Sequence, residues 1–317
     1  MLDVNLQAIT PLSESVLKLT FTDPANQPLP AFEAGAHIDV RVNDAITRQY
    51  SLCSSPSERY AYSVAVLRDP NSRGGSAAIH ASFQPGQRVQ ISAPRNLFAL
   101  NPEDAKTVLV AGGIGITPIM SMAHALAEQG KEFTVLYVNK PGQRVAFDTE
   151  LQHGFFADRV QILQPDNREQ VKAWLVQNIG EYSALSGLYT CGPNGFMDVV
   201  FSIANELNWP ANALHQERFG LEKVDTRSDK AFELFLKRSG LTIPVKASQT
   251  ALEALDDAGV EVDASCEQGV CGTCLLNVLE GEVDHRDGYL TEQEKSQHNQ
   301  FTPCCSRAVS ASLTLDL

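Results

Sequence analysis

Four cysteines near the end of the chain have the spacing of an iron–sulfur ligand set. Cys266, Cys271 and Cys274 follow one another as C-x4-C-x2-C, and Cys304 comes after a gap of 29 residues. This is the plant-type pattern, in which four thiolates hold one [2Fe–2S] cluster. Thiolates suit the role because they are soft ligands that donate charge to iron. The sequence therefore predicts a centre that carries one electron at a time.

A structural zinc site and a disulfide framework are the alternatives for these cysteines. Zinc ribbons usually present two separate C-x2-C pairs, whereas here one loop carries three cysteines and the fourth is remote. Disulfides are disfavoured because the 317 residues contain only seven cysteines, three of which crowd one short loop. The cluster is the preferred interpretation, and zinc remains the alternative.

Composition and charge exclude several classes of protein. The chain is 43% hydrophobic and 20% charged, and no apolar run approaches the length of a membrane span. With no basic, apolar leader at its N-terminus, we expect a cytoplasmic protein that does not bind membranes. A net charge of −13 argues against a nucleic-acid partner. Residues 232–317 hold 14 acidic and six basic side chains, which either steer a basic protein partner or only keep the surface solvated.

The first hundred residues have the pattern of a small antiparallel β-barrel. Strand-like runs at 15–21, 36–42 and 60–66 are separated by frequent turn signals, with one helical segment at 76–83. Many short strands with frequent turns favour a closed or nearly closed β-structure. We expect this barrel domain to occupy residues 1–101.

Arg48–Leu52 is the first string in the barrel that could bind a cofactor. The guanidinium of Arg48 suits a phosphate, because it can donate two parallel hydrogen bonds to phosphate oxygens. Tyr50 could lie flat on a ring system, and Ser51 could donate to a ring nitrogen. The same short sequence also occurs in ordinary β-strands, so whether it binds a cofactor depends on the residues that lie beside it in the fold.

Ser72–Ser76 is the second such string. Arg73 is another candidate phosphate ligand, and Gly74, Gly75 and Ser76 open the short helix. Backbone N–H groups at a helix N-terminus form a natural anion site. The alternative is an ordinary glycine turn.

A different pattern begins near Pro102. A buried-type strand at 107–111 runs into Gly112–Pro118 and then into a helix that should end at Gly130. Thr117 is expected to be the N-cap, with Pro118 as the first helical residue. Strand, glycine turn and helix is the arrangement that binds a dinucleotide pyrophosphate, although the proline interrupts the G-x-G-x-x-G fingerprint.

A second nucleotide-binding candidate follows the strand at 187–190, where Cys191-Gly192-Pro193 precedes a helix at 196–207. Alternating strands and helices predict a parallel-sheet domain over residues 102–222. Asn139 and Lys140 occupy the place where an acidic residue would indicate NAD, so the choice between NADH and NADPH stays open.

The last part of the chain fits a β-grasp ferredoxin. A polar stretch at 223–231 reads as a linker. Within 232–317 we expect a hairpin about Gly240, a helix opened by the capping box Thr250–Glu253, and a second capping box at Thr291–Glu294. A terminal strand should follow the fourth cysteine.

Taken together, these strings resemble the phthalate dioxygenase reductase family over essentially the whole chain. The resemblance implies a multidomain fold: an antiparallel β-barrel flavin domain, an α/β parallel-sheet nucleotide-binding domain, and a C-terminal plant-type ferredoxin domain. Further strings that carry it are Pro94–Phe98, Tyr189–Pro193, Asp284–Asp287, Cys304–Ala308 and Leu313–Leu317.

The resemblance also implies cofactors and the residues that hold them. FMN should occupy the barrel and NADH the α/β domain, with NADPH not excluded. The flavin positions correspond to Arg48, Tyr50, Ser51, Arg73, Gly75 and Ser76, with Gly74 in the same turn and Phe219 shielding the isoalloxazine. The nucleotide positions correspond to Gly112, Gly113, Gly115, Thr117, Pro118, Cys191, Gly192 and Pro193.

The implied activity is electron transfer from NADH through FMN and the cluster to the oxygenase component of a two-component Rieske-type system. Flavin must stand between the other two, because NADH gives two electrons together as hydride and the cluster accepts one. Ser51 and Cys191 are the candidate catalytic residues. Cys191 should help to position the nicotinamide, the alternative being a small buried thiol.

Alignment with the family makes Cys304 the fourth ligand and leaves Cys305 out, and an extended segment would point the two thiols to opposite faces. The oxygenase is expected to act on an aromatic substrate, and the reductase is expected to be a monomer. Rival functions are a reductase for a Rieske oxygenase of phthalate-like acids or quaternary amines, and a redox sensor. A sensor would not need both a flavin and a nicotinamide site.

Overall fold

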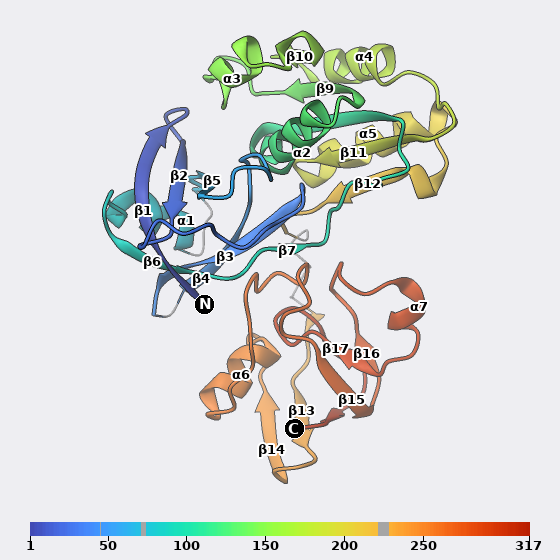
Figure 1. The fold of residues 1–317 in the computed structure, drawn as a ribbon. Helices are drawn as coiled ribbons and strands as arrows, with labels where there is room; N and C mark the ends of the chain where they lie inside the picture. The colour runs from blue at the N-terminus through green and yellow to red at the C-terminus, as the bar shows by residue number, and fades with distance from the viewer. Residues whose placement is uncertain (45, 71–73, 221–227) are drawn as a thin grey trace. The chain divides into compact units, whose positions relative to one another are not determined.

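The structure, a computed structural model, describes residues 1–317 except 45, 71–73 and 221–227 (Figure 1). Arg73 and most of the expected linker lie outside the described residues. The chain divides into two compact units, Met1–Arg218 and Phe219–Leu317. None of the helices in the described residues combines the length and apolar character that a bilayer-spanning segment needs.

The N-terminal part of the first unit is an antiparallel barrel, as predicted. Its strands run in the order β4-β3-β6-β1-β2-β5, with β7 beside β3. A bridge between Leu52, just after β4, and Val64 of β5 joins the two ends of that order. Alternate strand residues such as Leu19 and Phe21 fill the interior, where neither is exposed. The elements are β1 Leu2–Pro11, β2 Val16–Thr22, β3 Ala36–Asn43, β4 Ile46–Ser51, β5 Ala61–Leu67, α1 Gly75–Ser82, β6 Arg88–Ile91 and β7 Arg95–Asn96.

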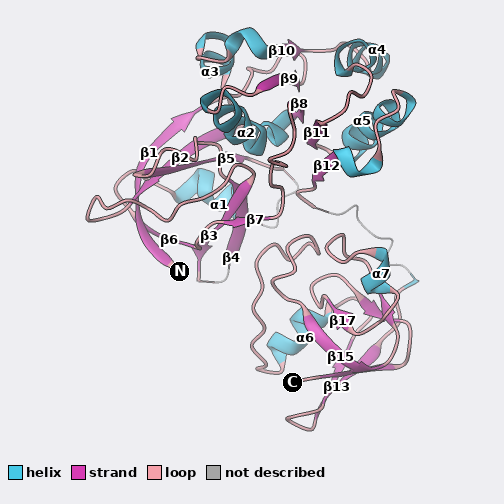
Figure 2. Cartoon of the chain, turned by 45° about the vertical axis from the view of Figure 1, so that its right-hand side comes forward, coloured by secondary structure: helices cyan, strands magenta, loops and turns pink. Residues whose placement is uncertain are grey.

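The second half of this unit is the predicted parallel sheet, with strand order β10-β9-β8-β11-β12. Figure 2 shows α2 and α3 on one face and α4 and α5 on the other. Both faces are therefore covered, which explains the unbroken apolar run in β8. The elements are β8 Lys106–Gly112, α2 Ile116–Glu128, β9 Glu132–Val138, α3 Asp148–His153, β10 Val160–Leu163, α4 Arg168–Ile179, β11 Ser186–Cys191, α5 Asn194–Glu206 and β12 Leu214–Glu217.

The expected cap of α2 is wrong. A 3-10 turn at Gly113–Gly115 leads directly into α2, whose N-cap is Gly115 without a side-chain cap. Thr117 lies inside the first turn, where its hydroxyl donates to the carbonyl of Ile114 at 3.1 Å. The glycine turn thus continues as helix earlier than the Thr-Pro pair suggested. Gly130 ends the helical stretch at a φ of 66°, as predicted.

One hydrophobic cluster joins the barrel to the sheet. Val16, Ala34 and Ala65 from the barrel are buried in the same cluster as Ile119 and Met122 of α2. Because interiors pack densely, such a shared cluster holds the barrel in a fixed place relative to the parallel sheet.

The second unit has the predicted β-grasp arrangement. Its main sheet has the order β14-β13-β19-β15-β17, and β13 runs parallel to the terminal strand β19. Both predicted capping boxes are present, opening α6 and α7. The elements are β13 Phe232–Leu236, β14 Leu241–Val245, α6 Ala251–Asp257, β15 Leu276–Glu280, β16 Val283–Asp284, α7 Glu292–Lys295, β17 Gln300–Phe301, β18 Arg307–Ala308 and β19 Ser312–Leu315.

A buried ion-pair network holds the beginning of this unit. Asp229 accepts two hydrogen bonds from Arg286, at 2.7 and 3.1 Å, and lies 3.5 Å from Nε of Arg307. Arg286 also pairs with Asp284 at 2.6 Å. The Arg307 guanidinium donates to the carbonyls of Gln249, Lys246 and Lys230. The positive charges of the two arginines thus balance the negative charges of the two aspartates.

Candidate functional site

The fold brings the two cofactor strings of the barrel together. Arg48 lies on β4, and its stem runs against the start of α1, where a Cβ on Gly75 would come within 2.7 Å of Arg48 Cγ. Gly74 has a φ of 92°, a conformation that favours glycine. A guanidinium therefore lies beside a glycine turn that opens a helix, and these groups fit a phosphate. Ser76 is buried there, and its hydroxyl accepts from the backbone N–H of Asp69 at 3.2 Å.

Tyr50 lies two residues along the same strand as Arg48. It is half-buried against the barrel core, and burial raises its pKa to about 12, opposed by the charge of Arg48. A neutral phenol ring in this place fits contact with a planar group. Its role as a flavin-stacking residue stays a prediction.

The two nucleotide strings also meet. Ala111 of β8 is paired with Cys191 of β11 in the parallel sheet, so the loops after the two strands leave from the same edge. A Cβ on Gly115 would come within 2.2 Å of the Cys191 carbonyl oxygen, and one on Gly192 would lie 3.0 Å from Cα of Gly112. Only glycine allows such an approach, and open α/β sheets bind ligands at this edge. Pro193 is the N-cap residue of α5 and Pro118 is buried in α2.

Ser51, Glu217 and Cys191 form a group at the junction of barrel and sheet. Ser51 is buried at the end of β4 and donates a hydrogen bond of 3.0 Å to Oε2 of Glu217. Glu217 ends β12, directly opposite Cys191 in the strand register. Ser51 and Cys191 are predicted from the sequence, whereas Glu217 is not. Its only signal was a place at the end of a short strand, four residues long, whose partner strand ends at Cys191.

Burial controls the protonation of this group. Burial raises the pKa of Glu217 to about 7, although the hydrogen bond from Ser51 favours its charged form. Burial, and then the nearby charge of Glu217, raises the pKa of Cys191 well above its ordinary value. Cys191 is thus a neutral thiol at neutral pH, which fits contact and positioning and does not fit a nucleophile.

Phe219 belongs to the second unit and is 40% exposed. Its expected role as a shield of the flavin ring stays a prediction.

The four predicted cluster ligands form two pairs. A hydrogen bond between the thiols of Cys266 and Cys271 raises the pKa of the first and lowers that of the second. A hydrogen bond between Cys274 and Cys304 likewise lowers the pKa of Cys274 and raises that of Cys304. A [2Fe–2S] cluster has two irons, each bound by two of four cysteines, so the pairing fits this cluster.

The loop around these thiols presents hydrogen-bond donors to sulfur. The backbone N–H of Gln268 donates to Cys266 at 3.3 Å, and that of Thr273 donates to Cys271 at 3.4 Å. Gly272 has a φ of 69° and lies under the ring of Tyr289, where a Cβ would come within 2.3 Å. Such donors tune the potential of a bound cluster.

The expected extended segment at Cys304–Cys305 is wrong. These residues lie in a turn, in which the N–H groups of Cys305 and Ser306 both donate to the carbonyl of Thr302, at 3.2 and 3.0 Å. The two thiols therefore do not alternate across a strand and are hydrogen-bonded to each other. Cys304 contacts Cys274, whereas Cys305 lies near the hydroxyls of Thr302 and Ser306, at 3.5 and 3.8 Å.

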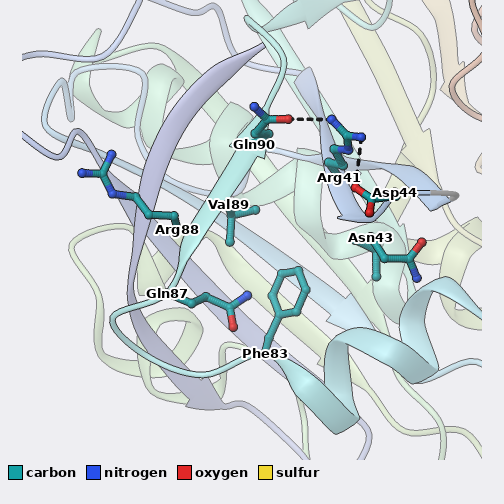
Figure 3. Close-up of a pocket in the computed structure, with 9 residues that line it drawn as sticks. Arg41, Asn43, Asp44, Phe83, Gln87, Arg88, Val89 and Gln90 are labelled. Atoms are coloured by element: carbon teal, nitrogen blue, oxygen red, sulfur yellow. Dashed lines mark hydrogen bonds and ion pairs between the residues drawn. The ribbon is translucent and has the colours of Figure 1, made fainter.

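A shallow pocket of about 220 Å³ opens on the outside of the barrel, between β3, β6 and the end of α1 (Figure 3). Arg41 reaches across it, donating to Gln90 at 2.8 Å and pairing with Asp44 at 3.2 Å. Among the described residues, none that lines it is predicted to bind flavin or nucleotide. It therefore does not belong to the candidate flavin site.

Comparisons with known proteins agree with this arrangement. Residues 234–309 match the model of a 2Fe-2S iron-sulfur cluster binding domain. The chain is 43% identical to a vanillate O-demethylase oxidoreductase of Pseudomonas sp. (strain HR199 / DSM 7063), over 100% of both chains. It is 39% identical to a phthalate dioxygenase reductase of Burkholderia cepacia, over 96% of this chain and 94% of the relative.

A solved structure of phthalate dioxygenase reductase, a modular protein for electron transfer from pyridine nucleotides to [2Fe-2S], superposes with a TM-score of 0.81. It is 36% identical and covers 100% of this chain and 98% of its own. The likeness therefore extends over both units.

Proposed function

The chain belongs to the phthalate dioxygenase reductase family, and from this we propose that it is the reductase component of a two-component Rieske-type oxygenase resembling vanillate O-demethylase. The observation that best supports this proposal is the hydrogen bond between Ser51 and Glu217 at the junction of the barrel and the parallel sheet. The same chain also contains two pairs of cysteines. The barrel, the glycine edge and the paired cysteines supply one site each for FMN, NADH and a [2Fe–2S] cluster. When bound, the flavin accepts a hydride from NADH and the cluster carries single electrons onward.

The residues of the barrel would bind and orient the flavin. The guanidinium of Arg48 and the N–H groups at the start of α1 suit the phosphate, with Gly75 allowing the close approach. Ser51, fixed by Glu217, holds a hydroxyl at the edge where the ring would meet the nicotinamide. A hydroxyl held in one orientation costs less to align when the substrate binds.

The residues at the edge of the parallel sheet would bind the nucleotide. Gly112–Pro118 supplies the turn for the pyrophosphate, and Cys191-Gly192-Pro193 lies beside it. Cys191 is fully buried, so its neutral thiol excludes water from that side of the site.

We propose the domain boundaries predicted from the sequence: residues 1–101 for FMN, 102–222 for NADH, a linker at 223–231, and 232–317 for the cluster. Separate apolar cores support the first and last of these. Among the residues that the structure describes, the barrel interior is formed by barrel residues and the ferredoxin core by residues of 232–317. We also propose that the protein acts as a cytoplasmic monomer.

The partner is proposed to be the oxygenase component, which supplies the Rieske centre. Identity to the vanillate O-demethylase relative exceeds identity to the phthalate dioxygenase relative, 43% against 39%, which supports an aromatic methyl ether as the substrate of the system. The rivals are oxygenases of phthalate-like acids and of quaternary amines.

Reconstitution tests this proposal. The purified protein is mixed with the oxygenase component of each of the three classes, and product formation is measured with NADH or NADPH. We expect the fastest turnover with vanillate O-demethylase oxygenase and NADH. If the oxygenase component of another class gives faster turnover, that oxygenase is the partner instead. A protein that does not oxidise NADH with ferricyanide or cytochrome c would be a sensor instead.

A further inference from the structure

Asp287 is a buried carboxylate to which the proposed function assigns no role. Its side chain is fully buried. One oxygen accepts from the backbone N–H groups of Tyr289 at 3.2 Å and Leu290 at 2.8 Å. The other accepts from the hydroxyls of Thr302 and Ser306, both at 3.4 Å. Both oxygens therefore act as acceptors, as in an ionised carboxylate.

These contacts connect the two segments that carry the cysteines. Thr302 and Ser306 stand two residues before and two residues after Cys304, and their hydroxyls are 2.8 Å apart. On the other side, the N–H of Gly288 donates to the carbonyl of Gly269 in the cysteine loop at 2.9 Å. Asp287 thus holds the turn of the fourth cysteine in register with the loop of the first three.

The charge of Asp287 has little compensation from the neighbouring arginines. Arg286 is engaged with Asp229 and Asp284, and Arg307 with Asp229. Among the described residues, Nδ1 of His285 lies 3.4 Å from one oxygen of Asp287. A negative charge in a low-dielectric interior acts strongly on a charge added nearby.

We propose that Asp287 is a positioning residue for the cluster and that its buried charge lowers the reduction potential of the cluster. The inference rests on the proposed function, because it requires a [2Fe–2S] cluster on the four cysteines. Reduction adds a negative charge to the cluster, so a fixed negative charge beside the Cys304 turn opposes it. Hydrogen bonds from Thr302 and Ser306 spread the carboxylate charge and weaken that opposition.

The test is a redox titration of the whole, cluster-loaded protein, followed by the EPR signal of the reduced cluster. Asp287→Asn keeps the shape and can still accept from the two N–H groups, so it should load the cluster and shift the midpoint to more positive potential. Glu292→Gln removes the same charge from a side chain that is 92% exposed and should leave the midpoint within error of wild type. Thr302→Val removes one donor and keeps the charge, so its midpoint should shift to more negative potential.

Opposite shifts in the asparagine and valine variants support the inference. An Asp287→Asn midpoint equal to that of wild type, or shifts of the same sign in both variants, would overturn it. If Asp287→Asn does not load the cluster, the sign of the Thr302→Val shift decides the matter. A wild-type protein that lacks the EPR signal while zinc is bound would instead refute the proposed function itself.

Discussion

The hydroxyl of Ser51, at the end of β4, donates a 3.0 Å hydrogen bond to Glu217, at the end of β12. Glu217 gives the junction of barrel and sheet a group that titrates near neutrality, because burial raises its pKa to about 7 against the opposing effect of this hydrogen bond. We expect the pH profile of flavin reduction by NADH to show a transition near that value, measured by stopped-flow absorbance. Glu217→Gln should remove the transition.

Ser51→Ala tests the same contact from the other side. The Ser51 hydroxyl stabilises the charged form of Glu217, so its loss should shift the transition to higher pH. The loss of one fixed hydrogen bond of about 1 kcal/mol should slow flavin reduction by roughly five- to tenfold. A profile that keeps its midpoint in Ser51→Ala would contradict the assignment.

The raised pKa of Glu217 also fixes the sign of its effect on stability. The protonated carboxyl is favoured in the folded state, so its contribution is complete below the ordinary value of 4.5 and is lost as pH rises through about 7. Glu217→Gln should therefore weaken the decline in the Tm of the first unit between these pH values. An unchanged decline, measured by calorimetry, would show that another group controls it.

The close contact at Gly115 predicts a specific defect in nucleotide binding. A methyl group there would meet the carbonyl of Cys191 and the N–H of Gly192, which are backbone atoms that cannot move alone. Overpacking of this kind costs about 1–3 kcal/mol, so Gly115→Ala should raise the Kd for NADH by roughly tenfold or more. Gly195→Ala is the matched control, because a Cβ on this exposed glycine of α5 meets nothing within 4 Å. If the two variants bind NADH with equal affinity, the turn at Gly115 does not belong to the nucleotide site.

The sequence was sufficient for elements whose signals are local. Three of the barrel strands, β2, β3 and β5, and the hairpin about Gly240 lie within a residue or two of their predicted places, because alternation and turn residues act over a few positions. Both capping boxes appeared as predicted, because each is made within four residues. The cysteine spacing likewise identified a ligand set that the fold gathers into pairs.

Features that depend on distant contacts were missed. Glu217 gains its raised pKa only because folding buries it, and the hydrogen bond that opposes this shift comes from Ser51, 166 residues away. Thr117 has the right type for an N-cap, yet the preceding glycines already turn into the helix. The Cys304–Cys305 turn is held by Asp287 through Thr302 and Ser306, a tertiary contact that propensity does not encode.

The proposed linker at 223–231 predicts that the electron path can be divided. A fragment ending at residue 222 retains the barrel, the parallel sheet and their shared cluster of side chains. It should bind FMN and oxidise NADH with ferricyanide at a rate near that of the whole chain, and reduce cytochrome c at a small fraction of that rate. If the fragment and the whole chain reduce cytochrome c equally fast, the cluster is not the main exit for electrons.

The choice between Cys304 and Cys305 as the fourth ligand is the most direct test of the cluster site. Both thiols lie in one turn, so they do not point to opposite faces of a strand. Their contacts distinguish them, because Cys304 contacts Cys274, whereas Cys305 contacts the hydroxyls of Thr302 and Ser306. Cys304→Ser should therefore lose the visible absorbance and EPR signal of the cluster, and Cys305→Val should retain both.

Iron and labile sulfide per chain are the decisive measurement, because they do not depend on activity. Cys305→Val removes the weak contacts of one thiol within the turn and should cost no more than about 1–2 kcal/mol of stability. It should still reduce cytochrome c, since the four sulfurs around the irons are unchanged. A Cys305→Val protein without iron, together with a Cys304→Ser protein that keeps it, would reverse the assignment and pair Cys305 with Cys274.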